Sequence, residues 1–277
     1  MESIILADQH IHSLCSGDGQ APMKDMAGAA AELGFEHICF TDHCDLEHYA
    51  TGKYDPDCLD MGKLLADFDE AASAWGDKIS LCLGIELGGG GHMPDRAGRI
   101  LEELNPDLVI GSVHSFPGEP DFYMYGRRPG QFESEEKCRE ILGQYVRELF
   151  NIAKLADFDV MGHIGYPLRY IKREGFDMDL SDFKSQLEEL FRVLIEKGRG
   201  IELNTAGLRN EFGRTMPSQD ILRLYRKAGG EIITMGSDAH DVKSVGAGIQ
   251  EACRMLKDAG FRYFTIFRER KPEFIRL

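Results

Sequence analysis

Two histidines separated by one residue stand near the start of the chain, in Asp8-Gln9-His10-Ile11-His12. The apolar run Ile4-Ile5-Leu6 before them predicts a strand, and alternate side chains of a strand face the same way. Both imidazoles can therefore face one point. Neutral imidazole is the commonest side-chain metal ligand, and Asp8 is close enough to orient one of the rings. The spacing indicates a metal site, although such a pair also arises by accident on a surface or in a core.

Further metal-capable or hydrogen-bonding side chains follow at the ends of the other predicted strands. With the first pair they are His10, His12, Asp42, His43, Glu86, His114, His163, Glu202, Asn204, Asp238 and His240, and they use six of the nine histidines. Solvation of strand ends explains one or two of these positions and explains the whole set poorly. Imidazole and carboxylate together suit zinc, manganese or iron, whereas an all-oxygen set would suit magnesium or calcium. The set is large enough for more than one ion.

These side chains need a scaffold that gathers strand ends, and apolar β-rich runs alternating with amphipathic stretches predict one. We expect strands at Ile4–Asp8, His37–Asp42, Ile79–Glu86, Leu108–His114, Asp159–His163, Gly200–Asn204 and Glu231–Ser237. We expect helices at Pro22–Leu33, Asp60–Trp75, Asp95–Glu103, Ser134–Leu155, Ser181–Lys197, Ser218–Lys227 and Val242–Ala259. Tyr263–Phe267 is an eighth strand or an extended tail. In an α/β barrel the C-terminal strand ends converge on one face, where active sites are built.

The whole chain has the composition of an ordinary globular protein, with 277 residues, 43% hydrophobic and 29% charged. This length fits one large domain or two small ones. We find no apolar segment of the roughly 20 residues that span a bilayer and no secretion signal, and we expect a cytoplasmic protein. Seven scattered cysteines without a C-x-x-C pair indicate reduced thiols. The net charge of -15 opposes binding to long nucleic acid or anionic membranes.

Two connections stand out between the predicted elements. The glycine run 88–91 predicts a mobile loop, and it lacks the lysine and helix of a phosphate-binding P-loop. The connection Ser115–Phe132 is rich in proline, glycine and aromatic residues, and we expect a lid or a loop that faces substrate.

At this point the sequence resembles the PHP (polymerase and histidinol phosphatase) family of metal-dependent phosphoesterases. The motifs that carry the resemblance are Asp8-Gln9-His10-Ile11-His12, Ser16-Gly17-Asp18-Gly19, Phe40-Thr41-Asp42-His43, Gly84-Ile85-Glu86, Gly111-Ser112-Val113-His114, Met161-Gly162-His163 and Gly236-Ser237-Asp238-Ala239-His240. They follow the family order over nearly the whole chain. The resemblance implies a distorted (β/α)7 TIM-like barrel, a single domain over residues 1–277 and up to three divalent ions (Zn, Mn or Fe).

The resemblance also implies how the ligands divide. His10, His12, Glu86 and Asp238 would hold the first ion, and Glu86 would bridge to a second ion held by His114 and His163. Asp18, His43 and His240 would hold the third. Some relatives have histidine where Asp18 stands, so this position does not settle the branch of the family.

For substrate, the segment Glu202–Arg209 resembles the one that ends in a phosphate-binding arginine in histidinol-phosphate phosphatases. Residues 165–169 look like a second contribution of this kind. The implied substrate contacts are Arg169, Arg209, Asn204 and Ser115, with Arg169 and Arg209 also stabilising charge in the transition state. Asp238 or His240 would protonate the leaving alkoxide. Many relatives carry His-Pro-Asp or His-Leu-Asp where this chain has His163-Ile164-Gly165, so recognition there is open.

The function that the resemblance favours is hydrolysis of a small phosphate monoester, above all L-histidinol phosphate in histidine biosynthesis. Three alternatives remain at this stage: a PHP phosphoesterase acting on nucleotides or oligonucleotide ends, an amidohydrolase-type metal hydrolase, and a metal-binding scaffold without catalysis. An amidohydrolase commonly has a bridging lysine on its fourth strand, where this chain has His114. We give no site role to His37, His48 and His92, and we expect Trp75 and the apolar face of residues 187–194 to be packing.

Overall fold

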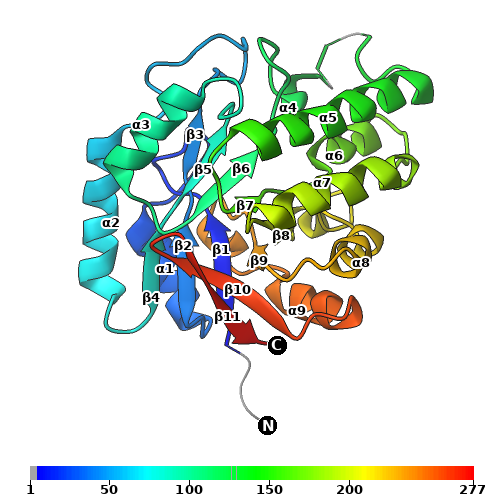
Figure 1. Ribbon diagram of the computed structural model, residues 1–277. Helices are drawn as coiled ribbons and strands as arrows, with labels where there is room; N and C mark the ends of the chain where they lie inside the picture. The colour runs from blue at the N-terminus through cyan, green and yellow to red at the C-terminus, as the bar shows by residue number, and fades with distance from the viewer. Residues whose placement is uncertain (1–4, 126, 129) are drawn as a thin grey trace.

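The computed structural model describes residues 5–125, 127, 128 and 130–277, and its parallel strands form a barrel surrounded by helices (Figure 1). The strands of the barrel are β1 (Ala7–Ile11), β2 (His37–Phe40), β3 (His43–Asp45), β4 (Ser80–Leu83), β5 (Ile85–Gly88), β6 (Val109–Ser112), β7 (Val160–Met161), β8 (Gly200–Asn204) and β9 (Ile233–Gly236). They form two parallel sheets, in the orders β1-β2-β4 and β3-β5-β6-β7-β8-β9. The predicted distorted (β/α)7 barrel is confirmed.

The barrel is distorted because two of its seven strand paths break in the middle. One path gives β2 and then β3, and the next gives β4 and then β5. The break in the second path falls at Gly84, where a Cβ would lie 2.6 Å from the carbonyl oxygen of Leu108. The predicted single strand Ile79–Glu86 is therefore wrong, since its two halves pair with different neighbours. A continuous apolar run carries no signal for such a change of partner.

The first and last strands of the barrel close it. The amide of Asp238 donates to the carbonyl of His10 at 2.8 Å, and the amide of His12 donates to the carbonyl of Ala239 at 2.8 Å. β1 begins at Ala7, later than expected, and the predicted start at Ile4 lies outside the described residues. This closure places His10 and His12 beside Asp238, although they are far apart in the sequence.

The helices that cover the barrel match most of the predicted ones within a few residues. They are α1 (Met23–Glu32), α2 (Met61–Trp75), α3 (Pro94–Leu104), α5 (Glu135–Leu155), α7 (Lys184–Glu196), α8 (Gln219–Lys227) and α9 (Ile249–Asp258). Side-chain caps fix two of the starts, because Asp60 accepts from Lys63 N and Ser134 accepts from Lys137 N. The predicted helix from Ser181 starts as a 3-10 turn, Ser181–Phe183, and that from Val242 is a 3-10 turn, Val242–Ser244, separated from α9.

Two short helices were not predicted, α4 (Phe122–Tyr125) and α6 (Tyr166–Arg173), together with a 3-10 turn at Ala206–Arg209. α4 lies inside the connection Ser115–Phe132, of which residues 126 and 129 are outside the described part of the chain. α6 follows His163 directly and carries Arg169. None of the described helices is long and apolar enough to cross a membrane.

The N-terminal end of the barrel is closed by an antiparallel hairpin, β10 (Tyr263–Arg268) with β11 (Lys271–Arg276), at the lower end in Figure 1. The run from Tyr263 is thus a strand, one of the two outcomes expected. A small apolar cluster fills this end of the barrel: Cys39, Cys82, Leu108, Ile110, Val160 and Phe267. Gln9 Oε1 accepts from the amide of Phe267 at 3.2 Å, which ties the hairpin to β1.

Candidate metal centre

The carboxylate of Glu86, buried at the start of β5, lies at the centre of the candidate site. Its Oε1 is 2.6 Å from His163 Nε2 and 3.1 Å from His114 Nε2. Its Oε2 is 2.9 Å from His43 Nδ1, 3.3 Å from His10 Nε2 and 3.5 Å from His12 Nε2. One oxygen faces the two histidines that follow β6 and β7, and the other faces the histidines at the end of β1 and the start of β3. Glu86 therefore has the placement expected of a bridging ligand.

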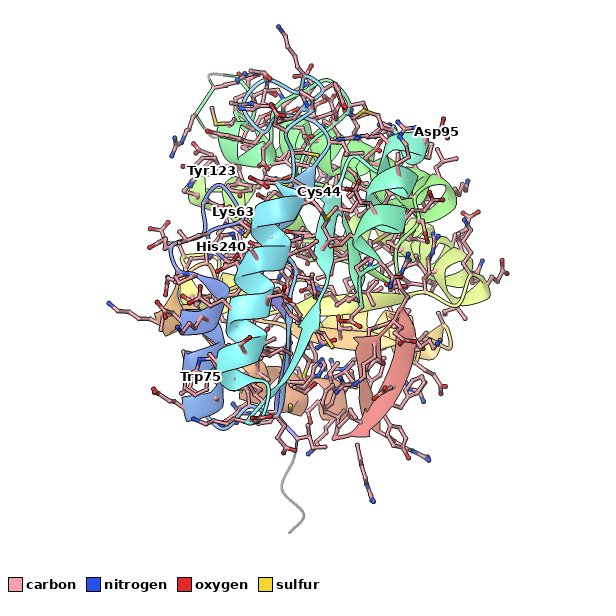
Figure 2. The ribbon with its side chains drawn as sticks, turned by 90° about the vertical axis from the view of Figure 1, so that its left-hand side faces the viewer. Cys44, Lys63, Trp75, Asp95, Tyr123 and His240 are labelled. Atoms are coloured by element: carbon pink, nitrogen blue, oxygen red, sulfur yellow. The ribbon has the colours of Figure 1, made fainter. Side chains whose placement is uncertain are left out.

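The remaining predicted ligands complete the rim. Asp238 Oδ1 lies 3.4 Å from His12 Nε2 and 3.5 Å from His240 Nδ1. Asp18 approaches His240 Nε2 at 3.3 Å and His43 Nε2 at 3.8 Å. Asp18 is 64% exposed, whereas His10, His12, His114 and His163 beside Glu86 are buried. All nine predicted ligands thus lie in one continuous cluster that opens to solvent at Asp18, and His240 is labelled in the upper half of Figure 2.

Three histidines of this cluster are oriented from outside it. His10 Nδ1 donates to Glu202 Oε1 at 2.6 Å, and His114 Nδ1 donates to Asp45 Oδ1 at 2.9 Å. His12 Nδ1 donates to Ser16 Oγ at 3.0 Å, because that hydroxyl in turn donates to Asp42 at 2.7 Å. In each ring the proton sits on Nδ1, so the neutral ring presents the lone pair of Nε2 to the cluster.

These lone pairs meet other electron-rich atoms. His10 Nε2 lies 3.0 Å from His12 Nε2, and His114 Nε2 lies 3.2 Å from His163 Nε2. Each pair also faces an oxygen of Glu86. Neutral imidazoles in this arrangement repel one another and the carboxylate unless a cation lies among them. In the part of the chain that the structure describes, three trios of residues have donor atoms within 4.8 Å of one another: His12-His43-His240, His10-His12-Glu86 and His43-Glu86-His114. The residues therefore fit divalent metal ions, and the mixed nitrogen and oxygen donors fit zinc, manganese or iron.

Carboxylates and imidazoles alternate in the cluster, and each shifts the pKa of its neighbours. Burial alone raises the pKa of Glu86, but His114, His10 and His43 outweigh it and hold that pKa well below its usual range. Burial lowers the pKa of His43, yet Glu86 and Asp45 raise it to about 9. Without metal, protons on the imidazoles compensate the carboxylates, and metal ions can take over that role.

Asp238 stands in the left-handed region, with φ of 56°, two residues after the end of β9. Asn204 Nδ2 donates to Asp238 Oδ2 at 3.2 Å, and its Oδ1 accepts from the amide of Ala206 at 3.0 Å. Asn204 is fully buried. Its polar atoms are engaged within the protein, so the structure does not favour the predicted substrate contact of Asn204.

The two predicted phosphate-binding arginines differ in what they contact. Arg209 donates to the carbonyl of Ser237 at 2.6 Å and to that of Asp238 at 3.1 Å, so its guanidinium braces the backbone after β9. Arg169 lies over the rings of Tyr166 and Tyr170, at 5.2 and 5.0 Å from their centroids. Among the described residues Arg169 has no hydrogen bond or ion pair. Its fork is therefore available to an anion, whereas that of Arg209 is largely engaged.

A small recess adjoins the cluster beside His114, with a volume of about 20 Å³. Its lining includes Asp45, Glu47, His92, Glu148 and the predicted substrate contact Ser115. Glu148 is buried on α5, and its Oε1 lies 2.5 Å from His92 Nε2. The hydrogen bond with Glu148 raises the pKa of His92. Three carboxylates face two histidines, His92 and His114, so the recess has a net negative charge.

Some functional positions had little signal in the sequence. Asp45 orients His114 from β3, a strand that lies just past the predicted strand His37–Asp42 and was not predicted. We expected Asp8 to orient one of the rings, and it does not. Its carboxylate instead accepts from the amides of Ser237 at 2.8 Å and Gly246 at 3.0 Å. Glu148 did have a signal, since it falls among Tyr145, Leu149 and Ile152 on the buried face of α5.

The glycine run 88–91, predicted as a mobile loop, is mostly buried and begins within β5. Gly88 is the last residue of β5, and a Cβ there would lie 1.8 Å from Asp45 Oδ1. Its missing side chain makes room for the carboxylate that orients His114. Gly236 serves the same purpose on β9, where a Cβ would lie 2.3 Å from Glu202 Oε1 and 2.4 Å from His10 Cβ.

Comparisons with protein families, with curated proteins and with solved structures agree with one another. The PHP domain family matches residues 8–206. A probable histidinol-phosphatase of Thermotoga maritima is 28% identical over 265 residues, covering 94% of this chain and 95% of that protein. Histidinol-phosphatase of Lactococcus lactis is 28% identical over 261 residues, covering 94% and 93%. A crystal structure of histidinol phosphate phosphatase from Lactococcus lactis, complexed with zinc, L-histidinol and phosphate, has a TM-score of 0.80 at 24% identity and covers 98% of this chain and 100% of that chain.

Proposed function

The chain belongs to the PHP domain family, and from that premise we propose that it is a metal-dependent phosphatase that hydrolyses L-histidinol phosphate to L-histidinol and phosphate, a step in histidine biosynthesis. We further propose that residues 1–277 act as one PHP-type unit. The observation that carries the proposal is the clustering of nine ligand-capable side chains, with Glu86 at the centre, at one end of the barrel. The names of the full-length relatives support the substrate.

We propose up to three divalent ions in this cluster, with His10, His12, Glu86 and Asp238 as ligands of the first. His114 and His163 would share Glu86 around a second, and Asp18, His43 and His240 would hold a third. When bound, such ions supply positive charge to a phosphate ester and make water a stronger acid at neutral pH. Glu202, Asp45 and Ser16 keep the Nε2 lone pairs of three imidazoles pointed into the cluster.

Arg169 binds the phosphoryl oxygens in this mechanism. Its planar fork matches a phosphate ester, and the rings of Tyr166 and Tyr170 hold it in place without using its N–H groups. Arg209 holds the carbonyls of Ser237 and Asp238, so it positions the Asp238 carboxylate and contributes positive charge from further away. Asn204 positions Asp238 as well.

The proton for the departing alkoxide comes from Asp238 or His240 at the open side of the cluster. His240 Nδ1 lies 3.1 Å from the carbonyl oxygen of Asp238, and its Nε2 faces the exposed Asp18. Both groups are also proposed ligands, and either would act as the acid only while it carries a proton and is not bound to a metal ion.

The negative charge of the recess beside His114 favours a substrate ester that carries a positively charged group close to its phosphate. A volume of about 20 Å³ accepts a group the size of one water molecule, which is also the size of an ammonium head. L-histidinol phosphate carries such an amino group. Replacing Glu148 by Gln should raise KM for histidinol phosphate about tenfold, the value of one charge-assisted hydrogen bond. KM for phenyl phosphate, which has no amine, should not change, and Glu140→Gln on the exposed side of α5 is the matched control.

The experiment that tests the proposed function is phosphate release by protein loaded with zinc or manganese. Histidinol phosphate should be the best substrate in a panel that includes mononucleotides and sugar phosphates. Glu86→Gln should abolish turnover while the circular dichroism spectrum stays native, which excludes a scaffold without catalysis. Faster release from a mononucleotide would replace the substrate assignment with the nucleotide alternative. Family membership leaves the amidohydrolase alternative without support.

A further inference from the structure

Two thiols lie in contact beside the metal centre. Cys44 Sγ and Cys58 Sγ are 3.6 Å apart. Cys44 is buried on β3, between His43 and Asp45, and is labelled in Figure 2 near the end of the barrel that carries His240. Cys58 is half-buried in the loop that leads to α2. Cys44 thus sits in the strand that supplies the proposed ligand His43 and the carboxylate of Asp45, which orients His114. Cys58 sits nearer the surface.

The loop between the two cysteines folds back toward the end of β3 and is held there by backbone hydrogen bonds. The contact between the two sulfurs is therefore part of the ordered fold. The amide of Asp55 donates to the carbonyl of Leu46 at 2.9 Å, and the amide of His48 donates to the carbonyl of Lys53 at 2.7 Å. A disulfide has an S–S distance of about 2.05 Å, so the sulfur atoms need to approach by about 1.5 Å. Cys58 follows both of these bonds in the chain, so it can supply that movement without breaking either of them.

The two sulfurs differ in reactivity. Arg96 Nη2 donates to the carbonyl of Pro56 at 3.4 Å, which places a positive charge near Cys58. The hydrogen bond with Cys44 and the charge of Arg96 lower the pKa of Cys58. Cys58 is also the more exposed of the two. It is therefore the thiol that meets an oxidant first, and Cys44 is the resolving thiol.

We propose that Cys44 and Cys58 are a modification site that a hydroperoxide converts reversibly into a disulfide, and that this bond lowers the activity of the metal centre. The Cys58 thiolate attacks the O–O bond and releases hydroxide or alkoxide, which leaves a sulfenic acid on Cys58. The sulfur of Cys44 then attacks that sulfenic sulfur, and water leaves. The two thiols together lose two electrons and two protons, and the peroxide is reduced to water or to an alcohol and water.

The effect on the centre follows from the position of Cys44. Pulling its sulfur toward the loop shifts β3 and with it both His43 and Asp45, which orients His114. Displacement of such an orienting group typically costs about 10- to 100-fold in metal affinity or activity. This second half of the proposal rests on the proposed phosphatase function, whereas the disulfide itself does not.

The test treats the zinc-loaded full chain with hydrogen peroxide and maps its peptides without reduction. We expect a peptide that joins Cys44 to Cys58, with an intact mass lower by two hydrogen atoms, and its loss on treatment with dithiothreitol. The linked peptide should be absent from Cys58→Ser and present in Cys15→Ser, which removes another half-buried thiol. Sulfinic acid on Cys58 without any cross-link, or a link to a different cysteine, would overturn the disulfide.

Activity is followed on the same samples. Phosphate release should fall about tenfold on oxidation and return on reduction, while Cys58→Ser keeps its activity throughout. A complete cross-link with unchanged phosphate release would overturn the regulatory half alone. Reduced protein that releases no phosphate from histidinol phosphate would contradict the proposed function, and the peptide map would still decide the disulfide.

Discussion

Replacing Glu202 by Gln tests how the buried carboxylates prepare the metal centre. Glu202 uses both of its oxygens, since Oε1 accepts from His10 Nδ1 at 2.6 Å and Oε2 accepts from the amide of His163 at 2.8 Å. A glutamine has a single oxygen. The amide of His163 can only donate, so it claims that oxygen and leaves the NH2 group facing His10 Nδ1. His10 must then accept there and move its proton to Nε2, which removes the lone pair that a metal would use.

The size of the effect follows from the bond that is lost. A hydrogen bond to a charged group contributes about 1.5 to 3 kcal/mol, and 1.4 kcal/mol corresponds to a factor of ten. We therefore expect metal to bind Glu202→Gln about 10- to 100-fold more weakly, in line with the loss of other groups that orient histidine ligands. Competition with a chromophoric chelator measures the affinity. Phosphate release should recover in part when the free metal concentration is raised.

Two other variants separate orientation from charge. Asp45→Asn still offers an oxygen to His114 Nδ1, and the second oxygen of Asp45 lies 3.7 Å from its closest histidine nitrogen, too far for a hydrogen bond. Its metal affinity should therefore fall less than that of Glu202→Gln. Glu231→Gln alters an exposed carboxylate and should change nothing. If Glu202→Gln binds metal as tightly as the native protein, or if Asp45→Asn has the larger effect, the tautomer argument is refuted.

Three further predictions concern pH, stability and substrate binding. Burial and the charge of Arg268 lower the pKa of His37 to about 4, so the folded protein keeps this ring neutral while the unfolded chain binds a proton below its ordinary pKa of 6.5. This stabilisation is present above pH 6.5 and is lost as the pH falls toward 4, by about 2 kcal/mol between pH 7 and 5; urea unfolding of His37→Asn should show a correspondingly shallower pH dependence. Asp8→Asn should lower the free energy of unfolding by about 3 kcal/mol, because an amide NH2 would face a backbone N–H, and an unchanged urea midpoint would contradict this. Arg169→Met should raise KM for histidinol phosphate and the inhibition constant of inorganic phosphate by about 10- to 100-fold, whereas a change in kcat alone would remove Arg169 from phosphate binding.

The ligands could be predicted from the sequence because they follow a rule of position. Most of them stand at or past the C-terminal end of a parallel strand, and a closed barrel brings those ends together. His43 and Glu86 instead stand where a broken strand path resumes, at the start of β3 and of β5. His10 and His12 needed only the period of two along β1, and Asp238 needed only the apolar run before it. Once the barrel closes through the bonds between β1 and β9, these residues are neighbours.

The orienting residues could not be predicted in the same way, because their roles depend on contacts across the barrel. Glu202 was visible as a polar strand end, yet its partners are His10, 192 residues away, and the amide of His163. Asp45 depends on a break in a strand path, and on a glycine opposite it in β5. Such pairings depend on which strands are neighbours and in what register, and the nearly continuous apolar runs of parallel strands buried on both faces carry little of that information.

The two ends of the barrel differ in what they contribute to stability. At the C-terminal end, six imidazoles and the carboxylates around them fill the volume, and burial of these groups costs stability unless each charge and each lone pair has a partner. At the N-terminal end, the apolar cluster under the hairpin and the ion pairs of Arg270 with Asp157 and Asp159 hold the strands together. The hairpin β10–β11 contributes no ligand, yet it closes the end opposite the site. The strands are therefore held in place by packing at the end of the barrel opposite the site. Substitutions of ligands should reduce metal binding more than they reduce the stability of the barrel.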